Sequence, residues 1–180
     1  ITVIVDNTAP GCSIQYPTSG QFASGTVTFK IAVSESVGVA SVYLRLTNVD
    51  TGLVVFNVST TLNTGSGYYE YTYDSTLTAD GNYSVSSWAT DTSGKITAAA
   101  PVSFKIDNNA PVLSITGPAD GSFVSGTVTI TAHATDTFWT GTMYRVDSGT
   151  WTDIGTAWDT TTVSDGTHTI TVKVTDASGR

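Results

Sequence analysis

The sequence predicts an all-β protein made of two tandem antiparallel β-sandwiches. Thr and Val, which favour strands, dominate the chain, and no stretch shows the 3.6-residue apolar period of a helix. Short alternating apolar runs are separated by Gly, Pro, Asn and Asp, as in antiparallel sheets. The chain also contains one long internal repeat, which predicts two related modules.

The repeat is marked by a segment that occurs as Asp6-Asn7-Thr8-Ala9-Pro10 and again as Asp107-Asn108-Asn109-Ala110-Pro111, an offset of 101 (107 − 6). Asp and Asn side chains bond local backbone and Pro cannot donate to a sheet, so this segment ends a strand. Residues 80–95 match 165–180 at an offset of 85 (165 − 80), so the first copy holds an insertion of 16 residues (101 − 85). We predict an N-terminal strand at 1–6, one module at 7–107 and a second at 108–180.

In the first module, alternating residues such as Val27, Phe29 and Ile31 predict strands buried on one face. Hairpin signals occur at Asp50-Thr51-Gly52 and Thr92-Ser93-Gly94. Seven short strands at this spacing favour a sandwich of immunoglobulin (Ig) type. The expected strands are 12–16, 25–34, 39–47, 52–59, 67–74, 82–90 and 98–106.

The second module predicts a similar sandwich that lacks its last strand within the chain. Arg180 falls opposite Lys95, just before the residues that lead into the last strand of the first module. The expected strands are 112–116, 126–135, 141–147, 150–158 and 166–175.

The start of the chain holds a complementary segment, because Ile1–Asp6 aligns with the last strand of the first module, Val102–Asp107. We expect its apolar residues to form a strand-donor interface that fills the second module of another copy. A donor and an acceptor at opposite ends would propagate a filament. The alternative is that the chain is a fragment of a longer array of modules. The flanking modules would then supply the last strand of the second module and the module that residues 1–6 complete. The donor residues are Ile1, Val3, Ile4 and Val5.

The formal net charge of −8, from 7 basic and 15 acidic residues, argues against nucleic-acid and anionic-membrane partners. Cys12 is the only cysteine, so no internal disulfide is expected, and its repeat counterpart Leu113 indicates a buried, inert thiol. The sequence has no initial Met, no signal peptide and no apolar run long enough to span a membrane, which suggests a mature product or a fragment.

The second module resembles the tandem Ig-like repeats of bacterial and archaeal surface proteins. The resemblance rests on three segments, Trp158-Asp159-Thr160-Thr161, Ser164–Val172 and Thr175-Asp176-Ala177-Ser178-Gly179. Residues 45–78 of the first module depart from it and suggest an elaborated loop or extra strand. The resemblance implies an extracellular, prokaryotic stalk, spacer, adhesin arm or envelope component, and it brings no catalytic residues.

Catalysis is not expected from the local sequence. His133 and His168 are far apart, without a Cys or metal-type spacing nearby, and no Gly-x-Ser-x-Gly nucleophile elbow occurs. We therefore predict no enzyme and no cofactor, with calcium as the one alternative. Its candidate ligands are Asp107, Asn108, Asp91 and Glu35, which loosely resemble a cadherin linker; equally, these residues can simply end strands and cap turns.

Aromatic residues raise the possibility of sugar binding. Tyr69, Tyr71 and Tyr73 share one strand face and Tyr68 lies on the other, while the second module adds Trp139, Trp151 and Trp158. Such rings stack on sugars, and they also fill sandwich cores. Two N-glycosylation sequons begin at Asn57 and Asn82.

We therefore expect a non-catalytic, extracellular structural protein that assembles with copies of itself or with flanking Ig-like modules. The alternative is an adhesin or carbohydrate-binding arm. It would bind surface glycans through the exposed aromatic strand 68–73 and the insertion of the first module.

Overall fold

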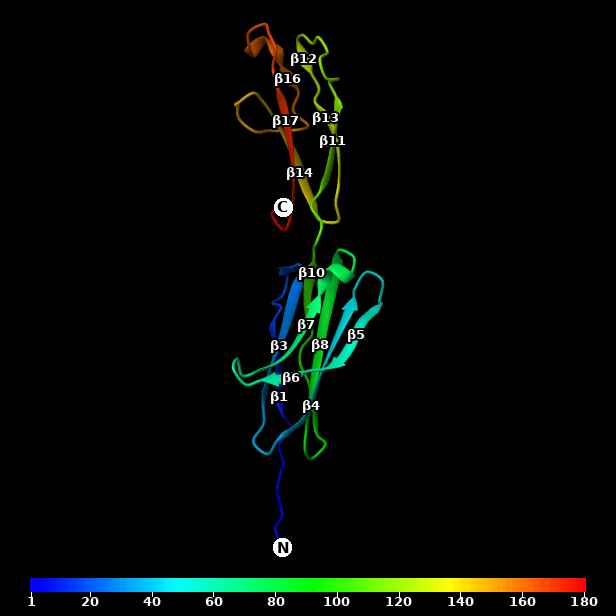
Figure 1. The fold of residues 1–180 in the computed structure, drawn as a ribbon, viewed down its shortest axis with the longest axis vertical. Helices are drawn as coiled ribbons and strands as arrows, with labels where there is room; N and C mark the ends of the chain where they lie inside the picture. Colours follow the sequence, from blue (N-terminus) through cyan, green and yellow to red (C-terminus); the bar gives the residue numbers. More distant parts are fainter. The chain divides into compact units, whose positions relative to one another are not determined.

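The computed structural model describes residues 1–180, which divide into two compact units, Ile1–Asn108 and Asn109–Arg180 (Figure 1). We call these units module 1 and module 2. Apart from two single 3₁₀ turns, the regular structure is entirely β. The prediction of an all-β chain with antiparallel Ig-like sandwiches is confirmed.

Module 1 is a sandwich of two sheets. One sheet has the strand order β1-β3-β7-β6, and the other has the order β2-β10-β8-β4-β5, with β9 paired to β8. All of these pairings are antiparallel except that of β2 with β10. The elements are β1 (Gly11–Tyr16), β2 (Phe22–Ala23), β3 (Thr26–Ser34), β4 (Val39–Asn48), β5 (Val54–Ser59), β6 (Thr61–Asn63), β7 (Tyr68–Asp74), the 3₁₀ turn η1 (Ser75–Leu77), β8 (Gly81–Asp91), β9 (Ile96–Ala98) and β10 (Val102–Ile106).

The core of module 1 lies between these sheets. Phe29, Leu44 and Val85 have no exposed surface, and Phe104 is 2% exposed. The Phe29 ring meets the Phe104 ring edge-on, with centroids 5.9 Å apart. Because β10 contributes Phe104 to this core, the last strand is an integral part of the sandwich.

Tyr83 fixes the corner that leads into β8. Its side chain is buried, and its hydroxyl donates a 2.7 Å hydrogen bond to the carbonyl oxygen of Ala79, four residues upstream. This is the tyrosine corner found in many Ig-like sandwiches.

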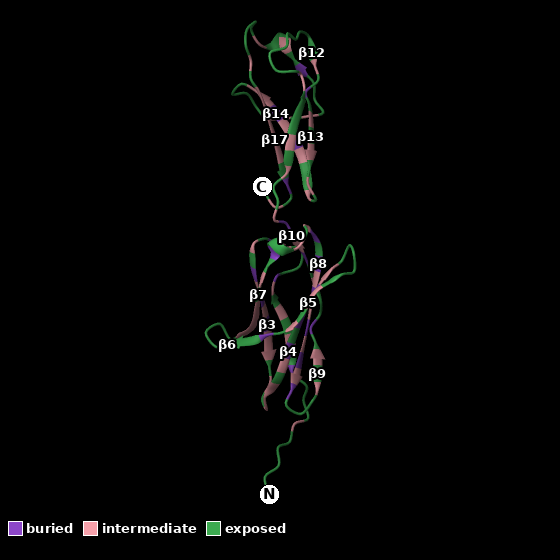
Figure 2. Ribbon diagram, turned by 45° about the vertical axis from the view of Figure 1, so that its right-hand side comes forward, coloured by how far each residue is buried: buried purple, intermediate pink, exposed green.

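Module 2 repeats the plan with fewer strands. Its pairs are β11-β13 and β12-β16, and its third sheet has the order β15-β14-β17. The core is small, and its buried hydrophobic residues are Ile130, Tyr144 and Trp158. Figure 2 colours only short stretches of module 2 as buried. The elements are β11 (Val112–Gly117), β12 (Thr127–Val128), β13 (Thr131–Thr135), β14 (Trp139–Val146), β15 (Thr152–Asp153), β16 (Trp158–Asp159), the 3₁₀ turn η2 (Thr160–Thr162) and β17 (Ile170–Asp176).

Several expected strands are interrupted. The expected strand 98–106 is divided into β9 and β10 around Pro101, which cannot donate to a sheet. The expected strand 126–135 is divided into β12 and β13, and the expected strand 150–158 leaves only the two-residue β15 and β16. Residues 1–6 form no strand, since no neighbouring chain segment pairs with them.

Candidate functional site

The principal candidate site is the free edge of β17 in module 2. In module 1 the equivalent strand β8 pairs with β4 on one side and with β10 on the other. In module 2, β17 pairs with β14, and no strand of the chain pairs with its other edge. An unpaired edge presents backbone groups that another strand can bond.

Apolar side chains lie uncovered at the matching positions of module 2. In module 1, Phe22 and Ala23 form β2, pair in parallel with β10, and leave Ala23 only 6% exposed. Their repeat counterparts, Phe123 and Val124, belong to no strand and are 105% and 40% exposed. The covering that β10 provides in module 1 is therefore absent from module 2.

The residues of module 2 that correspond to the neighbours of β10 can also be assigned from the repeat. Phe104 of β10 contacts Phe29 and Tyr83 in module 1. The corresponding positions in module 2 are Ile130 and His168. Ile130 is 1% exposed, so this position is already buried in module 2.

The predicted donor segment is extended and exposed. The exposed fractions of Ile1, Val3, Ile4 and Val5 are 124%, 76%, 79% and 72%. Four exposed large apolar side chains within five residues form an apolar patch of the kind found at interaction sites. Strand donation itself stays a prediction.

The predicted metal ligands lie in different surroundings. Asp91 and Glu35 lie at turns in module 1, with the Asp91 side chain fully buried. Asn108 is committed to the fold of module 1: its Oδ1 accepts hydrogen bonds from the Gly25 N–H and the Ser75 hydroxyl, and its Nδ2 donates to the Ser75 carbonyl. Asn108 therefore stabilises the end of β10 through these hydrogen bonds, and metal binding by Asn108 stays a prediction.

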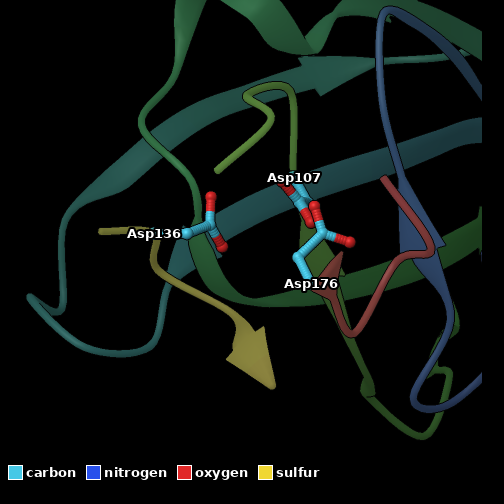
Figure 3. Close-up of side chains that lie close together, drawn as sticks. All are labelled: Asp107, Asp136 and Asp176. Carbon is cyan, nitrogen blue, oxygen red and sulfur yellow. The ribbon is translucent and has the colours of Figure 1, made fainter. Parts of the chain in front are cut away.

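Figure 3 draws Asp136 and Asp176 of module 2 together with Asp107, the residue that follows β10 in module 1. Asp107 is 1% exposed. The carboxylate oxygens of Asp136 and Asp176 lie within 4.8 Å of one another. The sequence reasoning did not select Asp136 or Asp176, although the repeat carried the signal: Asp136 is the counterpart of Glu35 (136 − 35 = 101), and Asp176 is the counterpart of Asp91 (176 − 91 = 85).

The pKa values of Asp91 and Asp176 reflect two opposing effects. Burial raises each pKa, whereas hydrogen bonds from the following Ser and basic residue lower it. The net pKa of both carboxyl groups is below the usual value, so both are ionised at neutral pH.

The tyrosine strand is half-buried, so the prediction that it is an exposed aromatic strand is wrong, while sugar binding by its residues stays a prediction. Tyr69, Tyr71 and Tyr73 pack against the buried cluster of module 1, and Phe56 contacts Tyr71 and Tyr73 at ring distances of 5.0 and 5.1 Å. Tyr68 is half-buried on the other face, with the Lys30 ammonium 5.9 Å from its ring centre.

The tryptophans of module 2 have separate environments. Trp158 is in the core, and Trp139 is 49% exposed. The ring of Trp151 carries the Arg145 guanidinium at 4.8 Å and the Lys173 ammonium at 4.4 Å, which is a cation–π arrangement.

Both sequon asparagines are exposed. Asn57 lies in β5, opposite Arg45 of β4. The side-chain amide of Asn82 donates to the Asp50 carboxylate at 3.1 Å, so a glycan on Asn82 would compete with this contact. Cys12 is half-buried against the core of module 1, and burial raises the pKa of its thiol.

The two histidines have different surroundings. His133 is exposed on β13. His168 contacts the Asp147 carboxylate through Nδ1 and the Ser164 carbonyl through Nε2, both at 2.8 Å. Because both ring nitrogens are engaged in these contacts, His168 serves as a structural bridge.

The sheet order of the two modules and the tyrosine corner define a pair of Ig-like β-sandwich modules. The model of the bacterial Ig domain family matches residues 10–86 and 111–172, and the chain belongs to that family, with two copies of the domain. A comparison with curated proteins finds no match. No helix in the structure is long and apolar enough to cross a membrane.

Three solved structures are similar to this chain. An endo-β-1,4-mannanase from Thermotoga petrophila is 19% identical with a TM-score of 0.47, over 58% of this chain and 21% of the mannanase chain. The fibronectin(III)-like modules of CbhA from Clostridium thermocellum are 18% identical (TM-score 0.42; 94% and 87% of the two chains). A tetra-tandem repeat in the extending region of a large adhesion protein is 19% identical (TM-score 0.45; 96% and 47%). The chain therefore spans about a fifth of the mannanase chain and about half of the adhesion-protein chain.

Proposed function

We propose that this chain is a non-catalytic, structural segment of an extracellular surface protein, and that module 2 is completed by a strand added at the free edge of β17. The observation that supports this proposal is the pair of copies within one chain. In module 1, β10 pairs with β8 and Ala23 is buried. Module 2 has no counterpart of β10, Val124 at the position of Ala23 is 40% exposed, and Phe123 is fully exposed.

Residues 1–6 have the composition that the edge requires. Ile1, Val3 and Val5 occupy the repeat positions of Val102, Phe104 and Ile106, and the last two of these are 2% and 0% exposed in β10. Burying each donor side chain would contribute about 1.5–3 kcal/mol, with strand hydrogen bonds in addition. The donor of one copy would then complete module 2 of the next copy, and the subunits would join head to tail.

The second source of the strand is residues that follow Arg180 in a longer polypeptide. Both sources make the chain a structural module, because both use the edge for assembly and not for chemistry. An adhesin or carbohydrate-binding arm is the weaker function, since three of its four predicted tyrosines pack in the core. Exposed Asn57 and Asn82 are the proposed glycan acceptors in a glycosylating host.

The test is the size of the purified chain, measured by light scattering and negative-stain imaging. Val3→Asp places a charge at the position of buried Phe104, whereas the control Thr2→Asp places it at the position of exposed Ser103. We expect fibres from the wild type and from Thr2→Asp, and small particles from Val3→Asp.

Monomers from all three chains would exclude donation by residues 1–6. In that case, extension of the chain beyond Arg180 should protect the β17 amides from hydrogen exchange. If it does not, the completed-edge proposal fails as well.

A further inference from the structure

In the turn that follows the long strand of each module, backbone amides bond one carboxylate oxygen of an Asp, and the other oxygen accepts no hydrogen bond. In module 1, Asp91 Oδ1 accepts hydrogen bonds from Ser93 N (2.8 Å), Ser93 Oγ (2.8 Å) and Lys95 N (2.9 Å). The other oxygen, Oδ2, is buried and accepts no hydrogen bond. We call the segment Asp91–Lys95 and its counterpart Asp176–Arg180 the carboxylate turns.

Module 2 reproduces this geometry. Asp176 Oδ1 accepts from Ser178 N (2.8 Å), Ser178 Oγ (2.7 Å) and Arg180 N (3.0 Å). Its Oδ2 is again buried without a hydrogen bond, and the residue is only 4% exposed. A buried carboxylate oxygen without a partner is costly, and in module 2 this cost points to an absent ligand at Asp176 Oδ2. In module 1 the Lys95 ammonium lies 3.7 Å from the corresponding oxygen of Asp91.

A second acid lies beside the unused oxygen in module 2. Asp136 Oδ1 accepts a hydrogen bond from the Phe138 N–H at 2.6 Å. A carboxylate oxygen of Asp136 lies within 4.8 Å of one of Asp176. Its counterpart Glu35 makes the same kind of turn, with Oε1 accepting from Val37 N at 2.9 Å. In module 2, backbone amides therefore hold one oxygen of Asp136 and one of Asp176, and Asp176 Oδ2 accepts no hydrogen bond.

Module 1 shows that positive charge is stabilised at such a position. The Lys95 ammonium lies 3.3 Å from Asp6 Oδ1 and 3.7 Å from Asp91 Oδ2, and these two acidic side chains are 4% and 0% exposed. Two buried carboxylates against one ammonium leave an excess negative charge inside the module.

We propose that Asp136 and Asp176 hold a divalent cation of the calcium class in module 2. Carboxylate oxygens fixed by backbone turns are hard ligands of the kind that Ca²⁺ takes, with backbone carbonyls and water filling the remaining positions. Sites with few carboxylates bind weakly, and extracellular modules typically have dissociation constants of about 10⁻⁴–10⁻³ M. The site would then be filled outside the cell, where the proposed structural role operates.

The test is a Ca²⁺ titration of the full chain, followed by calorimetry and by thermal unfolding with and without a chelator. Asp136→Asn and Asp176→Asn keep the turn-forming oxygen and remove the charge. The control is Asp153→Asn, because Asp153 also accepts a hydrogen bond two residues on, from Gly155 N, without a second acid beside it.

We expect the wild type and Asp153→Asn to bind Ca²⁺ with a dissociation constant of about 0.1–1 mM. Asp136→Asn and Asp176→Asn should each weaken binding at least about tenfold. Absence of binding at 10 mM Ca²⁺, or equal binding by all four chains, would overturn the proposal.

Terbium luminescence gives a second readout that does not depend on stability. Trp139 lies opposite Asp176 in the β14–β17 ladder, so excitation of its indole should sensitise Tb³⁺ bound at the pair. Trp139→Phe should remove the luminescence and leave the Ca²⁺ affinity unchanged. Luminescence that survives both Asp136→Asn and Asp176→Asn would place the ion elsewhere and contradict the assignment.

Discussion

At the scale of the residue, one position of the repeat carries different chemistry in the two modules. Tyr83 donates its hydroxyl to the carbonyl of Ala79, and its counterpart His168 contacts the carbonyl of Ser164, which is the counterpart of Ala79 (164 − 79 = 85). His168 also contacts the Asp147 carboxylate at 2.8 Å. The corner of module 2 therefore contains an imidazole, which titrates near neutral pH, at the position where module 1 has a phenol.

The direction of the pH dependence follows from the two pKa shifts. The hydrogen bond to Asp147, and then that to Ser164, raises the pKa of His168, while partial burial opposes them. A raised folded-state pKa stabilises module 2 fully below the unfolded pKa of about 6.5, and this stabilisation is lost as the pH rises through the folded pKa. Hydrogen bonds from Thr169 N and His168 lower the pKa of Asp147, so its contribution is present above about pH 3.9 and is lost as the pH falls through its folded pKa.

The prediction is that module 2 melts at lower temperature at pH 8.5 than at pH 5.5. His168→Tyr, which restores the corner residue of module 1, should remove most of this difference. The measurement is thermal unfolding at the two pH values for both chains. An unchanged pH dependence in His168→Tyr would assign it to other groups.

At the scale of the element, the hairpin between β8 and β9 depends on a backbone conformation that glycine supplies. Gly94 has φ of +91° and Gly179, at the same place in module 2, has φ of +94°. This left-handed turn places the Ser93 and Lys95 amides on Asp91 Oδ1. A side chain at Gly94 would meet no atom within 4 Å, so any cost of substitution is conformational and not steric.

Gly94→Ala should therefore destabilise module 1 by about 1–2 kcal/mol, because an L-residue with a Cβ disfavours the left-handed region. Gly94→Asn is the matched control and should cost less, since Asn tolerates this conformation. Urea unfolding monitored through the core aromatics measures both. Equal free energies of unfolding for the two variants would show that φ does not govern the turn.

The strands were predictable because alternation and turn residues are local signals, and the turn of module 1 was recognisable as a hairpin from Thr92-Ser93-Gly94. The pairing of one strand with another was not predictable. Residues 1–6 alternate as well as β10 does, yet they form no strand here, since a strand exists only with a partner. Likewise, the alternation of Tyr69, Tyr71 and Tyr73 identified a shared face, but only packing against Phe56 decided that this face was the core. The pairing of Asp136 with Asp176 is equally non-local, because 40 residues (176 − 136) separate them.

At the scale of the whole molecule, the two copies of one domain differ in how much core they bury. The core cluster of module 1 contains 12 buried residues, from Ala23 to Ile106, whereas that of module 2 contains 3. Val85 has no exposed surface in β8, while its counterpart Ile170 is only partly buried in β17. Hydrophobic stabilisation is roughly proportional to buried apolar area, so module 2 should be the less stable unit.

Calorimetry of the full chain at low concentration should therefore give two transitions, with module 2 unfolding first. Leu44→Ala should lower only the upper transition, by about 2–5 kcal/mol in stability, because Leu44 is fully buried in module 1. Trp158→Ala should lower or abolish only the lower one. A single transition that both variants shift would mean that the modules unfold as one unit.

Adding a peptide with the sequence of residues 1–6 links this thermal difference to assembly. A ligand that binds the folded form raises the melting temperature by mass action, so the peptide should raise the lower transition in proportion to the logarithm of its concentration and leave the upper one in place. A peptide with Val3→Asp is the control and should have no effect. A shift of the upper transition, or an equal response to both peptides, would contradict strand addition at β17, because module 1 already holds β10 at that edge.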